Sequence, residues 1–258
     1  MKNADRKKKI LELLRRENGQ PVQMLAAQLG VSHMTVRRDL EGMAAEGTVR
    51  LIHGGVLLPE NLKGETTESP YSLHTAGSQY ADQKKLIGIR AAKLVEDGDA
   101  LIIDSGSTTE CFAANLPGDR TLTVLSYALN IITATARMEN VRSIFAGGDL
   151  HRNTLMFESP EGNETMRRFR ANKAFISAAG VSREFGVTCL NAYERETKKI
   201  AIETAARKIL LVDASKFGKI RTEYFAELSE FDVVVSDSGL ADEHRRTLED
   251  LDIELILA

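Results

Sequence analysis

Apolar residues in the first sixty positions recur at helical spacing in three short segments. The segments cover residues 6–17, 23–29 and 32–45, and a glycine follows soon after each of them. Residues 48–58 then alternate between apolar and polar types, which predicts a small β-hairpin. Three short helices followed by a hairpin are the arrangement of a winged helix-turn-helix domain.

A different pattern occupies the rest of the chain, where short apolar runs alternate with amphipathic stretches. The apolar runs lie at residues 100–104, 121–126, 143–146, 174–177, 209–213, 232–236 and 253–257. The amphipathic stretches include residues 83–95, 128–138, 195–207 and 242–251. Continuous apolar runs separated by helices are typical of parallel strands that are buried on both faces. The sequence therefore predicts a doubly wound, mostly parallel α/β sheet.

The segment between these two patterns has a composition of its own. Residues 59–78 contain few large apolar side chains and are rich in glycine, serine and proline. Such a shift in composition marks a domain boundary. We therefore predict a winged helix-turn-helix domain in residues 1–58, a linker in residues 59–78 and an α/β domain in residues 79–258.

The composition favours a packed globular protein over a disordered, membrane-spanning or secreted one. The chain has 258 residues, of which 43% are hydrophobic and 28% are charged. It contains no run of about 18 apolar residues that would cross a membrane, and its charged N-terminus lacks the apolar core of a signal peptide. Cys111 and Cys189 are too few for a disulfide framework. We therefore expect a cytoplasmic protein with reduced cysteines.

The charges are distributed unevenly along the chain. Residues 1–56 hold 10 Lys and Arg against 6 Asp and Glu, whereas the remaining residues hold 24 against 31. A small basic part on a larger acidic one indicates that the basic part binds a polyanion. A solvated, lysine-rich first helix explains the same charges, and charge alone does not separate the two interpretations.

On the third predicted helix, the apolar and basic side chains fall on opposite faces. Val36, Leu40 and Met43 are spaced to face the core, which directs Arg38 away from it. Ser32 is placed to cap the helix and leaves N–H groups free at the end that approaches a nucleic-acid backbone. An outward arginine can bind guanine or clamp a phosphate, although an ordinary surface helix is the alternative. The predicted DNA-binding residues are Ser32, Met34, Thr35, Arg37 and Arg38.

Small and hydroxyl-bearing residues follow several predicted strands of the α/β domain. Residues 104–109 come directly after an apolar run and open a helix, which suits a phosphate site. Residues 146–149 and 178–181 follow two other strands in the same way. Because parallel strands bind ligands at their carboxyl ends, we expect these three strand ends to share one crevice.

Charged candidates for the same crevice come from two later segments. Glu194 and Lys198 are four residues apart on a predicted helix, so both side chains lie on one face. A routine helix salt bridge is the simpler interpretation of that pair. Lys216 lies in the turn at residues 213–218, where it would offer an ammonium group to a phosphate or belong to an ordinary polar turn.

The N-terminal fifty residues combine several short motifs at a characteristic spacing. The motifs are Arg6 with Ile10 and Leu14, Leu29-Gly30-Val31-Ser32, Met34-Thr35-Val36-Arg37-Arg38-Asp39-Leu40, Gly47 and His53-Gly54-Gly55. Together they resemble the N-terminal signature of the DeoR family of bacterial transcriptional repressors. In that family the segment is a helix-turn-helix whose second helix reads the operator, which here would be residues 32–45.

The resemblance continues through the α/β domain. Asp104-Ser105-Gly106-Ser107-Thr108, Gly147-Gly148, Gly186-Val187-Thr188, Lys198 and Asp213-Ala214-Ser215-Lys216-Phe217-Gly218 look like the family's effector-sensing domain. That domain is similar in fold to ribose-5-phosphate isomerase and typically senses phosphorylated sugars. The resemblance implies that the effector is held by Asp104, Gly106, Ser107, Thr108, Lys198 and Lys216.

The sequence departs from the commoner family pattern at two positions. Asn172 and Ser177 stand where an aspartate and a glycine are usual. Residues 126–130, 175–181 and 188–191 resemble members of the family that control deoxyribonucleoside catabolism. Within the family, this resemblance favours deoxyribose 5-phosphate as the effector.

Two functions from different classes are compatible with these observations. The first is a repressor of a sugar or nucleoside operon that binds operator DNA as a dimer or larger homo-oligomer and responds to a phosphorylated sugar. The second is a phosphosugar isomerase with Asp104, Glu194 and Lys198 as acid–base groups. The winged helix favours the first, because an isomerase does not need it. The five histidines are scattered and no nucleotide-binding motif occurs, so we expect neither a metal nor a cofactor.

Overall fold

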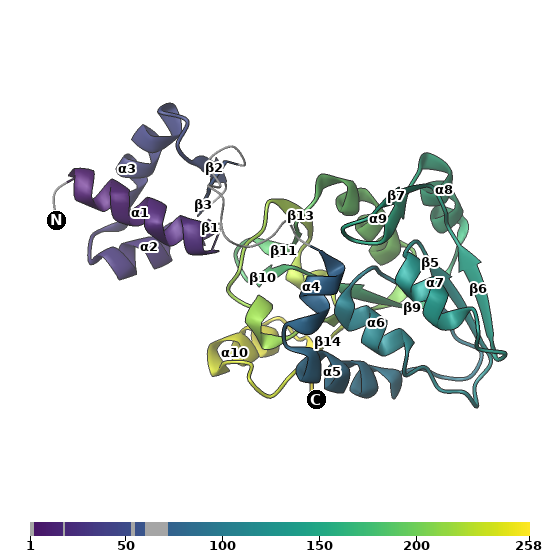
Figure 1. Cartoon of the computed structure of the whole chain (residues 1–258). Coiled ribbons are helices and arrows are strands. Elements are labelled where there is room, and N and C mark those ends of the chain that lie inside the picture. Colours follow the sequence, from purple (N-terminus) through teal and green to yellow (C-terminus); the bar gives the residue numbers. More distant parts are fainter. Residues whose placement is uncertain (1–2, 18, 53–54, 60–71) are drawn as a thin grey trace.

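The computed structural model describes residues 3–17, 19–52, 55–59 and 72–258. A small N-terminal domain of three helices and a short sheet lies beside a larger domain built around a central sheet (Figure 1). No helix in the described ranges is long and apolar enough to cross a membrane.

The N-terminal domain is the predicted winged helix-turn-helix. Its helices are α1 (Asn3–Glu17), α2 (Val22–Leu29) and α3 (His33–Ala45). Three antiparallel strands follow the order β1 (Gly19–Pro21), β3 (Gly55–Leu57) and β2 (Arg50–Ile52). Apolar side chains from all three helices and from the wing form one buried cluster, which includes Ile10, Leu14, Leu25, Val36, Leu40 and Val56. The tip of the predicted hairpin, residues 53–54, lies outside the described residues.

The larger domain contains a sheet of seven parallel strands. In chain order they are β4 (Ala100–Ile103), β5 (Leu122–Ser126), β6 (Val141–Phe145), β9 (Ala171–Ser177), β12 (Ala205–Leu211), β14 (Val233–Ser236) and β15 (Glu254–Leu257). Their order across the sheet is β15-β14-β12-β9-β4-β5-β6. The chain therefore builds outward in one direction from β4 and in the other direction from β9. The point between these two strands is the topological switch point, where open α/β sheets bind ligands.

Helices cover both faces of this sheet, as the doubly wound prediction requires. Alternate residues of a strand point to opposite faces, so Leu101 and Ile103 pack against α5 (Ala81–Ala92), α6 (Ser107–Ala113) and α7 (Leu129–Thr135). Ile102 lies in the opposite core, which also contains side chains from α8 (Pro160–Arg168), α9 (Ala192–Glu203) and α10 (Asp242–Asp250). Apolar strands between two helical layers explain the continuous apolar runs of the sequence.

One contact between two of these helices is unusually close. A side chain at Gly88 of α5 would place its Cβ atom 2.6 Å from the backbone carbon of Cys111 in α6. Glycine is therefore required at this position for α5 and α6 to pack at their observed separation.

The structure contains several short elements that the sequence did not predict. These are α8, the hairpin of β7 (Asp149–His151) and β8 (Met156–Glu158), and an antiparallel sheet of β10 (Gly180–Ser182), β11 (Gly186–Cys189) and β13 (Glu223–Ala226). A further helix, α4 (Leu73–Ser78), occupies the end of the segment predicted as a linker. Residues 60–71 of that segment lie outside the described residues.

One predicted boundary is wrong. The amphipathic stretch at residues 195–207 was expected to be helical throughout, but α9 ends at Glu203 and β12 begins at Ala205. The first residue of β12 pairs with Ala171 of β9. Pairing with the central sheet therefore overrides the helical propensity of the two alanines and the arginine that open β12.

Candidate DNA-reading helix and effector pocket

The third helix presents the predicted residues on its exposed side. The Oγ atom of Ser32 accepts a hydrogen bond from the backbone N–H of Thr35 at 3.2 Å, which caps α3. Met34 is 73% exposed, and Arg37 and Arg38 are exposed as well. Arg37 lies 3.5 Å from the Glu41 carboxylate. The opposite side of the helix is buried through Val36, Leu40 and Met43, as the spacing predicts.

A buried ion pair that the sequence analysis missed fixes this helix on the domain. Arg6 of α1 donates from Nε to Asp39 Oδ2 and from Nη2 to Asp39 Oδ1, the latter at 3.0 Å. Asn3 Nδ2 also donates to Asp39 Oδ1 at 2.7 Å. Both charged residues fall on the apolar stripe of their helices, because Arg6 precedes Ile10 by four residues and Asp39 follows Val36 by three. A charge on a core-facing position is the signal that would have found the pair.

The structure brings most of the predicted effector residues together at the switch point of the sheet. A small pocket of about 50 Å³ lies beside the ends of β4 and β9. Residues from six separate parts of the chain form its walls, and α4 contributes only Ala76. Its lining includes Lys84, Ser105, Gly106, Ser107, Thr108, Ser177, Ala178, Ala179, Cys189, Leu190, Glu194, Lys198 and Lys216.

Asp104 is placed differently from the other predicted residues, because it is fully buried and does not line the pocket. Its Oδ1 atom accepts a hydrogen bond from the Tyr127 hydroxyl at 2.5 Å. Its Oδ2 atom accepts from the backbone N–H and the hydroxyl of Ser177, both at 2.8 Å, and from Lys198 Nζ at 2.5 Å. Burial, together with the charge and hydrogen bond of Asp104, raises the pKa of Tyr127 well above its usual value.

Lys198 connects this buried network to the pocket. Its ammonium group donates to Asp104 Oδ2 and, at 3.1 Å, to the backbone oxygen of Ser177. Burial alone would lower the pKa of Lys198, but the Asp104 and Glu194 carboxylates outweigh burial and raise it. Lys198 therefore remains a cation at neutral pH.

Glu194 has mainly a structural role at the start of α9. Its Oε1 atom accepts hydrogen bonds from the backbone N–H of Asn191 at 3.1 Å and from the Asn191 side chain at 2.7 Å, which completes a capping box. Lys198 Nζ is 4.0 Å from Glu194 Oε2, a longer contact than the one it makes with Asp104. Burial raises the pKa of Glu194, although Lys198 and Asn191 oppose this shift.

Gly106 allows the β4–α6 turn to approach β9. A Cβ atom at this position would lie 2.5 Å from the hydroxyl oxygen of Ser177 and 3.1 Å from that of Thr109. The turn therefore needs glycine here to bring Ser107 and Thr108 to the pocket.

Lys84 of α5 is a pocket residue that the sequence analysis missed. Only 2% of it is exposed, and its Nζ atom donates to the backbone oxygens of Ala76 at 2.5 Å and Gln79 at 2.8 Å. Burial and the positive charge of Lys216 lower its pKa, while Asp213 acts in the opposite direction. A lysine three residues before the buried Ile87 lies on the core-facing side of α5, and that position is the signal for it.

Lys216 lies in the short 3₁₀ helix η2 (Ala214–Lys216) that follows β12. Its Nζ atom is 3.9 Å from Asp213 Oδ2. Asp213 is buried and caps η2 through its Oδ1 atom, which accepts a hydrogen bond from the backbone N–H of Ser215 at 3.1 Å. Three lysines on three different elements, α5, α9 and η2, thus line one pocket.

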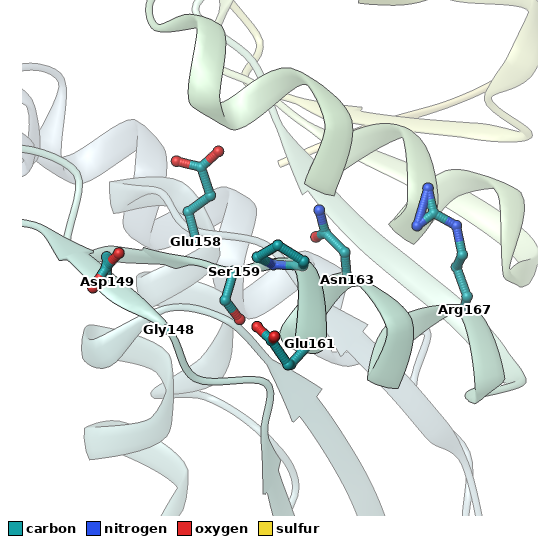
Figure 2. A pocket seen from close by; sticks show the side chains of 8 residues that line it. Gly148, Asp149, Glu158, Ser159, Glu161, Asn163 and Arg167 are labelled. Atoms are coloured by element: carbon teal, nitrogen blue, oxygen red, sulfur yellow. The ribbon is translucent and has the colours of Figure 1, made fainter.

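The expectation that three strand ends share one crevice is only partly correct. The ends of β4 and β9 do meet at the pocket, but residues 146–149 do not line it. Gly148 and Asp149 instead border a separate, open groove of about 690 Å³ between the β7–β8 hairpin and α8 (Figure 2). The strand before them, β6, is at the edge of the sheet, and two strands, β4 and β5, separate it from β9.

The open groove is larger, but several of its polar side chains make hydrogen bonds or ion pairs that hold the fold. Ser159 caps α8 through the backbone N–H of Gly162, and Asn163 accepts a hydrogen bond from Thr197. Arg167 pairs with Glu196, which lies outside the groove lining. Among the described residues, no group of three His, Cys, Asp or Glu side chains is arranged to hold a metal ion.

Two sequence families match this chain. A family described as the DeoR-like helix-turn-helix domain matches residues 6–61, and a family described as the DeoR C-terminal sensor domain matches residues 79–238. The chain is 34% identical over 235 residues to the deoxyribose operon repressor of Escherichia coli strain K12, which covers 91% of this chain and 90% of the relative. It is also 32% identical to the HTH-type transcriptional regulator IolR of Bacillus subtilis, over 91% of each chain.

Among solved structures, similarity extends to the ribose 5-phosphate isomerase A of Methanocaldococcus jannaschii. The TM-score is 0.40 and the identity is 19%, over 53% of this chain and 54% of the isomerase. The two family matches lie on the winged domain and on the domain that holds the pocket. The chain belongs to the DeoR family of transcriptional regulators.

Proposed function

We propose that this protein is a repressor of a sugar or nucleoside catabolic operon whose binding to operator DNA is controlled by a phosphorylated sugar. The observation that carries the proposal is the convergence of Lys84, Lys198 and Lys216 on one pocket in a DeoR-type sensor domain. Cations grouped in a confined site favour a ligand with more than one negative charge. A sugar phosphate has such a charge on one end and hydroxyl groups on the other.

The phosphate would lie between Lys84 and Lys216, beside the hydroxyl groups of Ser107 and Thr108. Lysine ammonium groups and hydroxyls are ordinary phosphate donors. The sugar would extend toward Lys198. Asp104 would act indirectly, because its carboxylate already accepts four hydrogen bonds from Tyr127, Ser177 and Lys198. We assign it the role of holding Lys198 in place.

Deoxyribose 5-phosphate is the effector we favour within this class. The support comes from the named function of the Escherichia coli relative, a deoxyribose operon repressor. The hydroxyl proton of Ser177 is already committed to Asp104 and to the backbone oxygen of Ser105, so it is not available to a sugar hydroxyl. Other phosphorylated sugars are the comparison that a binding screen must include.

The exposed side of α3 would read the operator through Arg37 and Arg38, with Ser32, Met34 and Thr35 beside them. An arginine fork in the major groove matches guanine, and a helix of this kind occupies one half-site. We further propose that the protein acts as a dimer or larger homo-oligomer, because two half-sites give the affinity that one domain lacks. The α/β domain would supply the contacts between subunits.

An isomerase is the second candidate, and the geometry argues against it. Sugar isomerisation needs a carboxylate or another base that can take a proton from the substrate. Asp104 does not line the pocket, Glu194 caps α9, and Lys198 is held as a cation by its acidic neighbours. We therefore propose that the pocket binds a sugar phosphate without turning it over.

A binding screen followed by an operator assay tests the proposal. Calorimetry with deoxyribose 5-phosphate, ribose 5-phosphate and their unphosphorylated sugars should give binding only for the phosphorylated compounds. The affinity of the protein for an operator duplex selected from a random pool should then change when the sugar phosphate that bound in calorimetry is added. Conversion of ribose 5-phosphate to its isomer at an enzymatic rate, or equal binding of the unphosphorylated sugars, would contradict the proposal.

A further inference from the structure

Helix α4 forms one wall of the effector pocket and is also the first described helix after the wing. Ala76 contributes to the pocket lining, and Gly77 faces Ser107, with 3.9 Å between a Cβ built on Gly77 and the Cβ of Ser107. The helix therefore touches the proposed phosphate site, and in the sequence residues 60–71 connect it to the DNA-binding domain.

Few interactions hold α4 in place. It has only six residues, one of them a glycine, and Ser72 at its N-terminus makes no side-chain capping bond. Isolated helices of this length are unstable in water. Its position depends on the burial of Leu73, on the hydrogen bond from the Leu73 N–H to the Asn153 oxygen at 2.7 Å, and on Lys84.

Lys84 is the main tie at the C-terminal end of α4. Its ammonium group donates to the backbone oxygens of Ala76 and Gln79, where a cation stabilises the exposed carbonyls of a helix end. Within the described residues, the hydrogen bonds of Lys84 go only to these neutral oxygens, whereas Lys198 donates to a carboxylate. A buried cation held by neutral groups interacts much more strongly with an anion that enters beside it.

Two other walls of the pocket are tied to the central sheet. The turn at Gly106 packs against Ser177 of β9, and Lys198 is fixed by Asp104 within the seven-stranded sheet. The pocket holds about 50 Å³, whereas pockets for small molecules are typically about 300 Å³ or more. Movement of one wall would make room for a sugar phosphate, and α4 is a short wall held by the few contacts described above.

We propose that α4 is a strap that Lys84 fastens in the unliganded protein and that the effector phosphate releases. The phosphate takes over the ammonium group of Lys84, the bonds to Ala76 and Gln79 are lost, and α4 moves away from the pocket. Because α4 continues into the chain leading to the winged domain, its release changes the arrangement of the domains and hence the operator affinity. This inference rests on the proposed effector site and adds how binding at that site changes the operator affinity.

Hydrogen–deuterium exchange of the full-length protein tests the strap directly. Saturating deoxyribose 5-phosphate, or whichever phosphorylated sugar binds in calorimetry, should increase exchange in residues 73–79 while exchange in β4 and β9 stays unchanged. Lys84→Met should show the same fast exchange of residues 73–79 without any ligand. Lys85→Met is the matched control, because Lys85 is an exposed lysine on the same helix, and it should behave as the wild type does.

Operator affinity separates the strap from a simple ligand contact. If Lys84 fastens α4, unliganded Lys84→Met should bind the operator with the affinity of the liganded wild type, a change of about 5- to 150-fold. If Lys84 only contacts phosphate, the variant should retain the affinity of the unliganded wild type, and the strap would be overturned while the effector site remained. Lys216→Met should lose ligand binding and keep residues 73–79 protected.

The remaining outcomes distinguish the strap from the proposed function. Binding of a sugar phosphate with unchanged or slower exchange in residues 73–79 would overturn the strap alone. Failure of every phosphorylated sugar to bind the wild type would overturn the proposed function and its release of α4 together. Should Lys84→Met fail to fold, the exchange of the wild type with and without ligand still decides.

Discussion

The ammonium group of Lys198 lies 2.5 Å from Asp104 Oδ2, and at most 2% of either side chain is exposed. Removing one partner from a buried ion pair leaves the other charge without compensation, at a cost of about 3–5 kcal/mol. We therefore expect Lys198→Met to lower the free energy of unfolding by this amount in urea denaturation. Lys198→Met combined with Asp104→Asn should recover part of the loss, because both charges of this ion pair are then removed and the asparagine oxygen still accepts a hydrogen bond.

The exposed pair of Arg183 and Asp250 is the control for that experiment. Both side chains are more than half exposed, although their atoms are 2.7 Å apart. Arg183→Ala should change the free energy of unfolding by less than about 1 kcal/mol. A comparable loss in Arg183→Ala and Lys198→Met would show that burial does not set the contribution of the pair.

Replacement of Arg38 should weaken operator binding without unfolding the protein. The residue is exposed on α3, opposite the buried stripe of that helix. Arg38→Ala should cost about 1–3 kcal/mol of binding free energy if the arginine reads a base. Fluorescence anisotropy with a selected operator measures the change, and Arg90→Ala on the exposed side of α5 is the control. Unchanged affinity in Arg38→Ala would remove Arg38 from the reading surface.

Arg6→Ala should act on the operator through the fold instead. The buried bonds from Arg6 to Asp39 fix α3 on α1, so their loss should lower the thermal stability of the winged domain. Differential scanning calorimetry should show a lower midpoint temperature of unfolding for Arg6→Ala but not for Arg38→Ala. A stable Arg6→Ala domain with weak operator binding would indicate that Arg6 contacts DNA itself.

Lys216→Ala should impair the response to the effector and leave the unliganded protein nearly unchanged. The ammonium group lies at the pocket on η2, and 23% of the Lys216 side chain is exposed. Titration calorimetry should show weaker sugar phosphate binding, and operator affinity without sugar should match the wild type. Equal effector affinity in Lys216→Ala and in the wild type would mean that the phosphate lies elsewhere.

The pH dependence of effector binding should follow the titration of the Lys84 ammonium group. Burial and the charge of Lys216 lower the pKa of Lys84, while Asp213 and Cys111 oppose the shift. The protonated amine attracts the phosphate, so affinity is full below this pKa and falls as the pH rises through it. The affinity for the sugar phosphate, measured by calorimetry, should therefore decrease at a lower pH than it would if Lys84 had the pKa of an ordinary lysine. Lys84→Met should bind more weakly and lose this step.

The oligomeric state is open to a direct measurement. Light scattering after gel filtration at micromolar concentration should give a mass at least twice that of one chain. The reason is that one winged domain covers a single half-site, whereas two linked domains bind with higher affinity. A monomer that binds the operator tightly would contradict the proposal.

The spacing of apolar residues was sufficient to predict the large elements of the fold. Val36, Leu40 and Met43 identify the buried side of α3 because helical periodicity relates them directly. The strands of the parallel sheet are apolar on both faces and therefore stand out in the sequence. The strands β10 and β11 were not recognised because neither contains a continuous apolar run, and the second partner of β11, β13, lies far along the chain.

In the candidate site, too, features made by adjacent residues could be predicted, whereas features made by residues distant in sequence could not. The turn at Ser107 and Thr108 was recognisable because its residues are adjacent in sequence. Lys84 was missed because its partners, Ala76 and Gln79, contribute backbone oxygens that no sequence motif records. Asp104 was expected to face the sugar, but Ser177 and Tyr127 occupy its oxygens, and only the fold brings these residues together.

Gly88 sets the spacing between two helices that supply opposite sides of the effector pocket. Lys84 lies one turn before it on α5, and Ser107 and Thr108 begin α6, against whose backbone Gly88 packs. A methyl group at this position would push the helices apart and widen the gap that a phosphate must bridge. At the proposed effector site, a residue without a side chain would therefore set the distance between groups that bind the phosphate, although it contacts no ligand itself.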